Sequence, residues 1–552
     1  MPVITLKIER FSKFAGRNLT LAEMTNWLPW LGVDIEDEGE NHVKIEFNPN
    51  RIDFCCYAGV ARAYKGLRGW EVGLPKYHAN KAVTTLNIDE SVSEVRPYML
   101  GGIVKGIQLD EDDIVDLMEM QEDLHWGIGR DRKKASIGVH NLDSVKPPFT
   151  FTTADPERVK FIPLGETREM NLRNILQRHE KGKKYKHLVN GATKYPLLVD
   201  KNDEVLSMPP IINSELTKVD VNTTNLFLDV TGTDNFAVKK SLNVLSTSLA
   251  DMGGTLERVK VIFSDKTLIS PELNPQNMEL QKSTTNKILG LKLPESKIIQ
   301  CLKKCRLGAG HSHDGIIEVA VPPYRVDILH EVDLVEEVAI GYGYYKLKPT
   351  LPSSVTIGKP HSTFRTASLV RQIMTGLGFT EAMNFTITNE KLHYKKMRRK
   401  TETVIRIANP VSSEYTIMRQ DLLPNLMKNL TDNKRESLPH LLFEISDVIK
   451  PNKTLEARCE RQLHVASVSS HSNSNFSEIK SHLEALMLNI GANSWKFKKT
   501  EHPSFIKGRV AAIIIRGKPV GVVGEIHPEV LNNFQLETPT AAFEVDLETL
   551  IK

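Results

Sequence analysis

The chain has 552 residues and a formal net charge of +4, from 72 lysines and arginines against 68 aspartates and glutamates. At about 150 residues per domain, this length predicts three or four domains. Hydrophobic residues make up 40% of the chain and charged residues 25%, an ordinary globular mixture that excludes a mainly disordered chain, a collagen-like fibre and a disulfide scaffold. The balanced charge also excludes a protein that holds nucleic acid by bulk charge alone.

The sequence favours a reducing environment away from membranes. Its five cysteines are sparse and odd in number, which fits a compartment where thiols stay reduced. The N-terminus lacks the apolar segment of a secretory signal, and no run approaches the ~20 apolar residues of a membrane span. We therefore expect a soluble, cytoplasmic chain with no membrane partner.

Residues 1–85 are predicted to form a small α/β unit. Val43, Ile45 and Phe47 alternate with polar residues, which is the pattern of a half-buried strand. Residues 57–67 then read as a helix.

Residues 90–267 are predicted to form a larger mixed α/β domain with two helices, at residues 112–124 and 235–252. Apolar runs predict four strands, at residues 99–107, 134–139, 226–230 and 259–263. Two basic segments, 129–138 and 179–187, read as loops. They could contact phosphates or form ordinary solvated surface.

The predicted strand that begins at Leu226 leads into a group of polar residues. Asp229, Thr231, Thr233 and Asp234 follow one another closely. Hydroxyls and carboxylates in this position can line a polar pocket, or they can form a turn that caps the next helix. Spacing alone favours the turn.

Residues 270–347 are predicted to form a short unit that follows a linker at 270–278. Apolar residues between 298 and 307 indicate a helix, residues 316–321 a strand, and residues 333–340 a second helix.

Cys301, Cys305, His311 and His313 raise the question of a zinc site. Their spacing is poor for structural zinc, which usually uses closely spaced pairs of the CxxC type. We favour the alternative that the cysteines are buried helical thiols.

An acidic helix face is the strongest grouping of charge in the chain. Asp333, Glu336 and Glu337 stand at helical spacing, and Asp327 lies just upstream. Carboxylate oxygens of this kind suit Mg²⁺, whereas a solvated acidic face is the simpler alternative. The opposite, apolar face is predicted to consist of Val332, Val335 and Ala339.

The segment 347–360 carries three prolines and is the clearest boundary in the chain. Residues 355–552 are predicted to form another α/β domain. It would contain a helix at 369–377, an amphipathic helix at 476–490 and a hairpin at 509–526.

Several blocks, in order and at consistent spacing, make the chain resemble the beta chain of phenylalanine–tRNA ligase in its archaeal and eukaryotic form. The resemblance runs essentially end to end. The blocks are residues 47–66, 121–143, 179–189, 207–215, 229–234, 322–344, 409–433, 443–448 and 521–531.

The resemblance implies an α+β multidomain fold. After the N-terminal α/β domain in the sequence, residues 90–267 would be the family's editing domain, which hydrolyses tRNA-Phe mischarged with tyrosine. Residues 270–347 would be a small winged-helix-like domain. Residues 355–552 would be a class II synthetase-like core with an antiparallel sheet, and this core would be catalytically degenerate, because no arginine-containing motif that grips ATP is evident and Arg419 lacks the catalytic context.

The resemblance also implies partners and sites. The family works as a tetramer of two alpha and two beta chains with tRNA-Phe, and the alpha chain binds L-phenylalanine and ATP. Asp327, Asp333, Glu336 and Glu337 match positions that the family uses for Mg²⁺, in a site that could be shared with the alpha chain. The candidate editing pocket is lined by Ser214, Asp229 and Thr231, with a positioned water as the attacking group.

Editing has a physical basis, because a phenylalanine pocket rejects an isostere with one added hydroxyl only ~100-fold. Two other functions stay open: a free-standing editing hydrolase for mischarged tRNA, and a non-enzymatic RNA-binding scaffold. A synthetase-like core at 355–552 argues against the first, and a polar pocket around Asp229 argues against the second.

Overall fold

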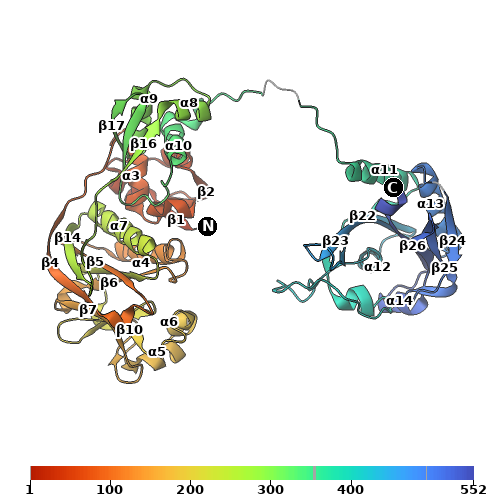
Figure 1. The fold of residues 1–552 in the computed structure, drawn as a ribbon, viewed down its shortest axis with the longest axis horizontal. Coiled ribbons are helices and arrows are strands. Elements are labelled where there is room, and N and C mark those ends of the chain that lie inside the picture. Colours follow the sequence, from red (N-terminus) through yellow and green to blue (C-terminus); the bar gives the residue numbers. More distant parts are fainter. Residues whose placement is uncertain (1, 352–355, 493, 552) are drawn as a thin grey trace. The chain divides into compact units, whose positions relative to one another are not determined.

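The computed structural model describes residues 2–351, 356–492 and 494–551 (Figure 1). The chain divides into two compact units, Met1–Leu351 and Pro352–Lys552. The division falls inside the proline-rich segment 347–360. In the described parts of the chain, no helix is long and apolar enough to cross a membrane.

The first unit begins with a three-stranded antiparallel sheet in the order β1-β3-β2, accompanied by three helices. The predicted strand is β3, whose Val43, Ile45 and Phe47 are buried, and the predicted helix at 57–67 is α3. The elements are β1 (Val3–Lys7), α1 (Ile8–Ala15), α2 (Leu21–Trp27), β2 (Val33–Glu38), β3 (His42–Phe47) and α3 (Tyr57–Leu67).

A sheet of ten strands dominates the first unit, counted over the described residues. Its order is β12-β11-β10-β7-β4-β14-β5-β13-β6, with β15 paired to β14. The strands are β4 (Ala79–Ile88), β5 (Tyr98–Lys105), β6 (Ala135–Asn141), β7 (Phe149–Ala154), β10 (Tyr195–Val199), β11 (Val205–Met208), β12 (Ile212–Asn213), β13 (Leu226–Gly232), β14 (Thr255–Ile262) and β15 (Thr267–Ser270). The sheet begins at Ala79, so a boundary near residue 85 cuts through β4, which pairs with β14 and β7.

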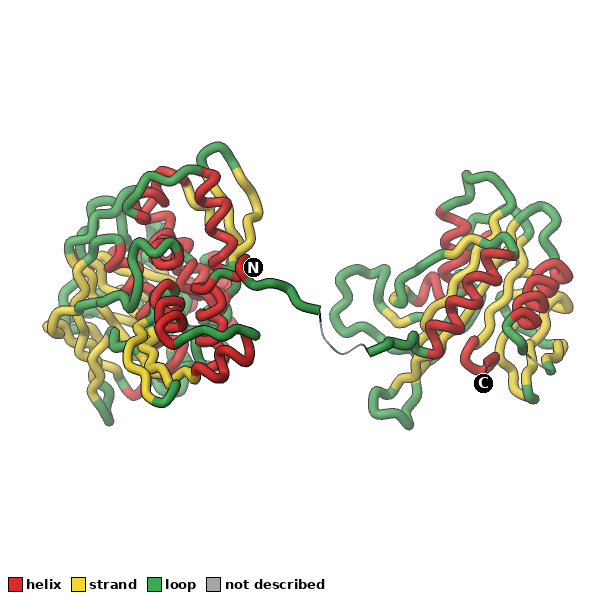
Figure 2. The backbone as a smooth tube through the Cα atoms, turned by 90° about the horizontal axis from the view of Figure 1, so that it is seen from above, coloured by secondary structure: helices red, strands yellow, loops and turns green. Residues whose placement is uncertain are grey.

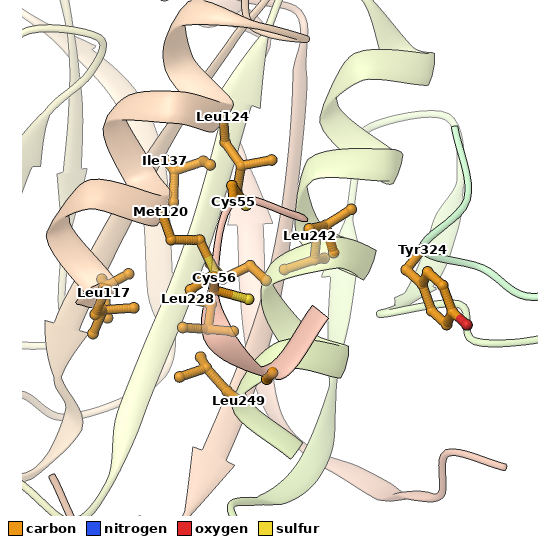
Figure 3. Close-up of a cluster of buried hydrophobic side chains, with 14 of the residues drawn as sticks. Cys55, Cys56, Leu117, Met120, Leu124, Ile137, Leu228, Leu242, Leu249 and Tyr324 are labelled. Atoms are coloured by element: carbon orange, nitrogen blue, oxygen red, sulfur yellow. The ribbon is translucent and has the colours of Figure 1, made fainter. Parts of the chain in front are cut away.

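The N-terminal sheet and the ten-stranded sheet share one hydrophobic core. Figure 3 shows Cys55 and Cys56 between the side chains of α4 (Glu111–Trp126) and α7 (Asn235–Asp251). Leu124 comes from α4 and Leu242 from α7, and the thiol of Cys56 donates a hydrogen bond to Ser248 Oγ at 3.3 Å. The core of residues 1–85 is therefore continuous with the core of the next region.

Two short helices in the large sheet region differ from the prediction. The segment 179–187 was predicted to be a basic loop, but α6 (Glu180–Tyr185) follows α5 (Leu172–Arg178) directly. The lysines of this segment suggested a loop. Tyr185 anchors the helix because it is buried in a cluster that includes Phe161 and Leu197, which the local pattern does not indicate. A small ribbon of β8 (Lys160–Phe161) and β9 (Met170–Asn171) precedes the two helices.

The last part of the first unit is a three-stranded sheet, β16-β18-β17, covered by helices. Its elements are β16 (Gln276–Gln281), α8 (Lys282–Leu289), α9 (Glu295–Lys304), β17 (Gly308–His313), β18 (Ile316–Val321) and α10 (Glu331–Tyr342). The strand at 316–321 and the helices around 298 and 333–340 were predicted correctly. The predicted linker at 270–278 was wrong at its end, because β16 begins at Gln276 and pairs with β18.

The second unit is a seven-stranded mainly antiparallel sheet, in the order β19-β22-β23-β27-β26-β25-β24 over the described residues. Its elements are α11 (Ser362–Gly376), β19 (Thr380–Glu381), β20 (Ile387–Thr388), β21 (Ile417–Met418), α12 (Leu423–Asp432), β22 (His440–Pro451), β23 (Cys459–Ser470), α13 (Phe476–Asn489), β24 (Trp495–Lys499), β25 (Phe505–Ile515), β26 (Lys518–Ile526), α14 (Pro528–Asn533), β27 (Thr540–Asp546) and α15 (Leu547–Ile551). Figure 2 shows the helices of this unit lying against its strands.

Alternation along the strands gives the second unit two apolar layers. One layer joins α11 and α13 to residues such as Val465 and Phe543, and the other joins α12 and α14 to residues such as Ala466 and Ala542. The predicted hairpin is β25–β26. Its turn holds Arg516 and Gly517 at φ of 50° and 80°, as a two-residue turn with both central residues left-handed requires.

Candidate active site in the ten-stranded sheet

β13 is buried along its whole length although it contains an aspartate and a threonine. Asp229 is 2% exposed and Thr231 is fully buried. A buried carboxylate or hydroxyl is costly unless it is hydrogen-bonded. The hydrogen-bond partners of Asp229 and Thr231 therefore show whether each side chain has a structural role or faces a binding site.

Asp229 is held by a histidine on the neighbouring strand β6. Asp229 Oδ2 lies 2.7 Å from His140 Nε2, and His140 Nδ1 lies 2.9 Å from Thr217 Oγ1. The residue directly opposite Asp229 is Gly138. A Cβ on Gly138 would lie 2.1 Å from Asp229 Oδ2, so the aspartate and histidine can meet only because position 138 has no side chain.

Thr231 accepts hydrogen bonds from a buried arginine, Arg96. Thr231 pairs with Ser136 across β13 and β6, with their hydroxyl oxygens 3.0 Å apart. Arg96 donates to both hydroxyls at 3.1 Å and to the Thr231 carbonyl at 2.7 Å. Burial lowers the pKa of Arg96 to about 9, since no carboxylate bonds to it directly. The hydroxyl of Thr231 is thus already hydrogen-bonded to Arg96 and Ser136.

A cavity of about 660 Å³ opens beside these strands, within the size range of small-molecule sites. Asp229 and Thr217 line it, but Ser214 and Thr231 are not among its lining residues. The hydroxyl of Ser214 accepts a bond from the Leu216 amide at 3.3 Å and caps a short helix. Of the three predicted pocket residues, the structure therefore places only Asp229 at the cavity. Apolar lining residues include Ile114, Leu117, Met118, Ile137, Val139 and Ile211.

Charged residues form a second polar group on the cavity wall. Glu122 Oε1 lies 2.7 Å from Arg132 Nη2, 3.3 Å from Lys181 Nζ and 3.9 Å from His125 Nδ1. His125 and these two cations hold the pKa of Glu122 well below its usual range. Burial lowers the pKa of His125 to about 4, and its Nε2 accepts a bond from the Ile137 amide at 2.8 Å.

The prediction that the basic segment 129–138 is a solvated or phosphate-binding loop is wrong at Arg132, which is buried. Arg130, Asp131 and Arg132 all have positive φ, between 49° and 66°, an uncommon run for residues with side chains. The turn points Arg132 inward, where it donates to the Ile211 carbonyl at 3.0 Å and is 7% exposed. Backbone strain of this kind is typical of functional sites.

Sequence reasoning missed His140, His125, Thr217 and the Glu122–Arg132 pair. His140 follows Gly138 at a spacing of two, so both face the same side of a strand. That signal was present in the sequence. The His125–Glu122 contact is local, at a spacing of three on α4. The other partners named above are 10 to 89 positions away, and no local pattern joins them.

The acidic helix α10 is arranged differently from the prediction. Glu337 is buried and Val332 is 54% exposed, so the predicted apolar face is wrong at Val332. The cause is Arg325, which donates to both carboxylate oxygens of Glu337 at 2.6 and 3.1 Å and to those of Asp327 at 2.6 and 2.8 Å. Glu337 turns inward to neutralise this buried guanidinium.

The remaining acidic residues serve other purposes. Asp333 accepts from the amides of Leu329 and His330 and so completes the capping box of α10. Partial burial, followed by the neighbouring carboxylates, raises the pKa of Glu336. Asp327 and Glu337 share the guanidinium of Arg325, and among the described residues no group of three or more His, Cys, Asp or Glu is placed to hold a metal. The Mg²⁺ site, which could be shared with the alpha chain, stays a prediction.

The two cysteines of the disfavoured zinc pattern have different surroundings. Cys301 is buried in the core of this region, and the thiol of Cys305 donates to the Glu337 carbonyl at 3.2 Å. The side chain of His311 lies outside those that the structure describes.

Three family models match the chain in order. A B3/4 domain model matches residues 108–250, which contain the cavity. A tRNA synthetase B5 domain model matches residues 278–344, and a phenylalanyl tRNA synthetase beta chain CLM domain model matches residues 347–547. The chain that carries this cavity is thus a protein of the tRNA synthetase class.

Relatives that match the whole length of the chain identify the family within this class. The chain is 43% identical to the phenylalanine–tRNA ligase beta subunit of Archaeoglobus fulgidus, over 99% of this chain and 98% of the relative. It is 42% identical to that of Methanosarcina barkeri, over 100% and 99% of the two chains. A crystal structure of an N-terminal fragment of the Pyrococcus horikoshii beta subunit matches with a TM-score of 0.60 and 36% identity, over 62% of this chain and all of the fragment. The chain belongs to the phenylalanine–tRNA ligase beta subunit family.

Proposed function

We propose that this chain is the beta subunit of a cytoplasmic phenylalanine–tRNA ligase and works with an alpha subunit, in a tetramer of two alpha and two beta chains. The complex joins L-phenylalanine to tRNA-Phe with ATP, and the alpha subunit carries the activation chemistry. Similarity over the full length of relatives with this name supports the proposal.

The second unit supports a division of labour between the two chains. We propose that its antiparallel sheet is a class II synthetase-like core without its own ATP chemistry. Arg419 is fully buried, and it donates to Glu444 at 2.8 Å and to the Asp447 carbonyl at 3.1 Å, so its guanidinium is bound within the fold. The pure chain should not catalyse ATP–pyrophosphate exchange with phenylalanine. Robust exchange would refute the division of labour.

We further propose that the cavity beside β13 edits tRNA-Phe mischarged with tyrosine. The observation that carries this proposal is Asp229, a carboxylate held by His140 in the wall of a cavity that is otherwise largely apolar. The apolar lining suits an aromatic ring, and the carboxylate can accept a hydrogen bond from the phenolic hydroxyl that phenylalanine lacks. A site built to bond a hydroxyl discriminates strongly against the analogue without it, because its buried polar group would otherwise stay unpaired.

The roles within the cavity follow from the contacts. His140 orients Asp229 and is fully buried, so no contact with substrate is assigned to it. Thr217 holds His140 in turn and lines the cavity beside Asp229. Glu122, Arg132 and Lys181 lie on another part of the wall and are suited to the polar end of an aminoacyl ester. Attack on the ester is assigned to a water molecule.

The editing proposal is tested by deacylation of tyrosyl-tRNA-Phe. In the purified complex, Asp229→Ala should slow this reaction about tenfold or more, the loss of one hydrogen bond to a charged acceptor, while phenylalanine charging stays intact. Asp234→Ala is the matched control, because that carboxylate only caps α7 and pairs with Lys134. Equal deacylation by the wild type and Asp229→Ala would remove Asp229 from the site.

A further inference from the structure

A second cavity, of about 350 Å³, lies in the second unit on the sheet face opposite α13. Side chains alternate along β23 and β27, so that Val465 and Val545 pack under α13 while His464, Glu544 and Asp546 line the cavity. The cavity is separate from the candidate editing site, which belongs to the first unit. Its size is at the lower end of the range for small-molecule sites.

The cavity wall contains a histidine with one nitrogen unused. His464 Nδ1 lies 2.8 Å from Glu544 Oε1, and the same carboxylate accepts bonds at 3.0 Å from the amides of Leu422 and Leu423. Nδ1 is therefore the donor in this pair. His464 is 5% exposed, and its Nε2 has no hydrogen-bond partner among the described residues. A buried polar atom without a partner costs free energy, and the cavity is where a partner can lie.

Two further polar groups on the wall are also uncommitted. Lys450 and Gln462 line the cavity, and neither makes an ion pair or side-chain hydrogen bond to the described residues. With the ring proton on Nδ1, His464 Nε2 is an acceptor, whereas Lys450 donates and Gln462 can do either. The wall therefore favours a ligand that carries both an acceptor, such as a carboxylate, and a donor, such as an ammonium group.

The charge of the wall argues against a simple anion. Two cations, Arg399 and Lys450, face three carboxylates, Asp421, Glu544 and Asp546. Arg399 is already paired with Asp421 and with Glu402. These five groups leave one more carboxylate than cations on the wall, so a polyanion such as ATP would be repelled. A ligand with an acceptor at one end therefore needs a positive group at the other.

We propose that this cavity binds a free α-amino acid or a zwitterion of the same size. The ligand carboxylate bonds to Lys450 and Gln462, and its ammonium group donates to His464 Nε2 and compensates the excess of carboxylates. The proposal does not depend on editing or on the activity of the complex.

The test is ligand binding by the full-length chain. Saturation-transfer NMR with a mixture of the proteinogenic L-amino acids identifies the best ligand, and calorimetry then measures its affinity. Lys450→Met should weaken binding about tenfold or more, through loss of one charge-assisted hydrogen bond. Lys453→Met is the matched control, because Lys453 is exposed beyond the end of β22 and its loss should leave affinity unchanged. Acetate, ammonium and ATP should each bind more weakly than the amino acid.

Three results would overturn the proposal. These are no binding of any amino acid at millimolar concentration, equal affinity in the wild type and Lys450→Met, and tighter binding of inorganic phosphate or ATP than of every amino acid. Because Lys450 is only partly buried at the cavity edge, its replacement should not unfold the chain, and melting curves of both variants check this.

Discussion

Glu337→Gln tests whether the acidic helix serves the fold or a metal. Arg325 is 1% exposed at its side chain and bonds to Glu337 and Asp327, which are 6% and 11% exposed. Gln keeps one acceptor oxygen but removes the charge. Breaking a buried ion pair costs about 3–5 kcal/mol, and because Asp327 still neutralises Arg325, we expect about 2–4 kcal/mol of local destabilisation.

Glu336→Gln is the matched control for this experiment. It removes the same charge one position earlier, where partial burial and neighbouring carboxylates raise the pKa of Glu336 and disfavour its ionisation. Its effect should lie within about 0.5 kcal/mol of zero.

Hydrogen exchange followed by mass spectrometry on α10 measures the opening free energy of that region, with EDTA and with Mg²⁺. We expect loss of protection in Glu337→Gln only, equal in both buffers. If both variants lost protection in Mg²⁺ and neither did in EDTA, the carboxylates would form a metal site and the reasoning from Arg325 would be wrong.

The remaining predictions concern the candidate editing site and the helix packing. Gly138→Ala should abolish tyrosyl-tRNA-Phe deacylation by the complex, because its Cβ would lie 2.1 Å from Asp229 Oδ2; full activity would show that this contact is not needed. His125 is neutral when folded, with a pKa of about 4 against 6.5 in the free side chain, so its stabilising contribution is complete above pH 6.5 and is lost as pH falls toward 4. His125→Gln should therefore flatten the pH dependence of the melting temperature in that window, and an unchanged slope would count against a buried neutral histidine. Gly341→Ala should lower the melting temperature, since its Cβ would lie 2.2 Å from the Cys301 carbonyl between α10 and α9; an unaltered melting temperature would mean that the two helices can separate freely.

Local patterns determined most of the secondary structure. Alternation at Val43, Ile45 and Phe47 identified β3, and helical spacing identified α13. These patterns work because strand and helix periods are properties of consecutive residues. They failed at α6, where the burial of Tyr185 depends on tertiary contacts.

The sequence by itself also determined the family, because ordered blocks at constant spacing survive along the chain, and the full-length relatives agree with it. The ordinary composition and the charge of +4 did not reveal it.

Only the tertiary structure decided which polar residues act together. Asp229 could have been a capping residue, yet His140 and Gly138 on the next strand make it the wall of a cavity. Glu337 could have been a metal ligand or a solvated charge, yet Arg325 draws it inward. In both cases the free energy of a buried charge depends on its spatial neighbours, and strand pairing and helix packing bring those neighbours from elsewhere in the chain.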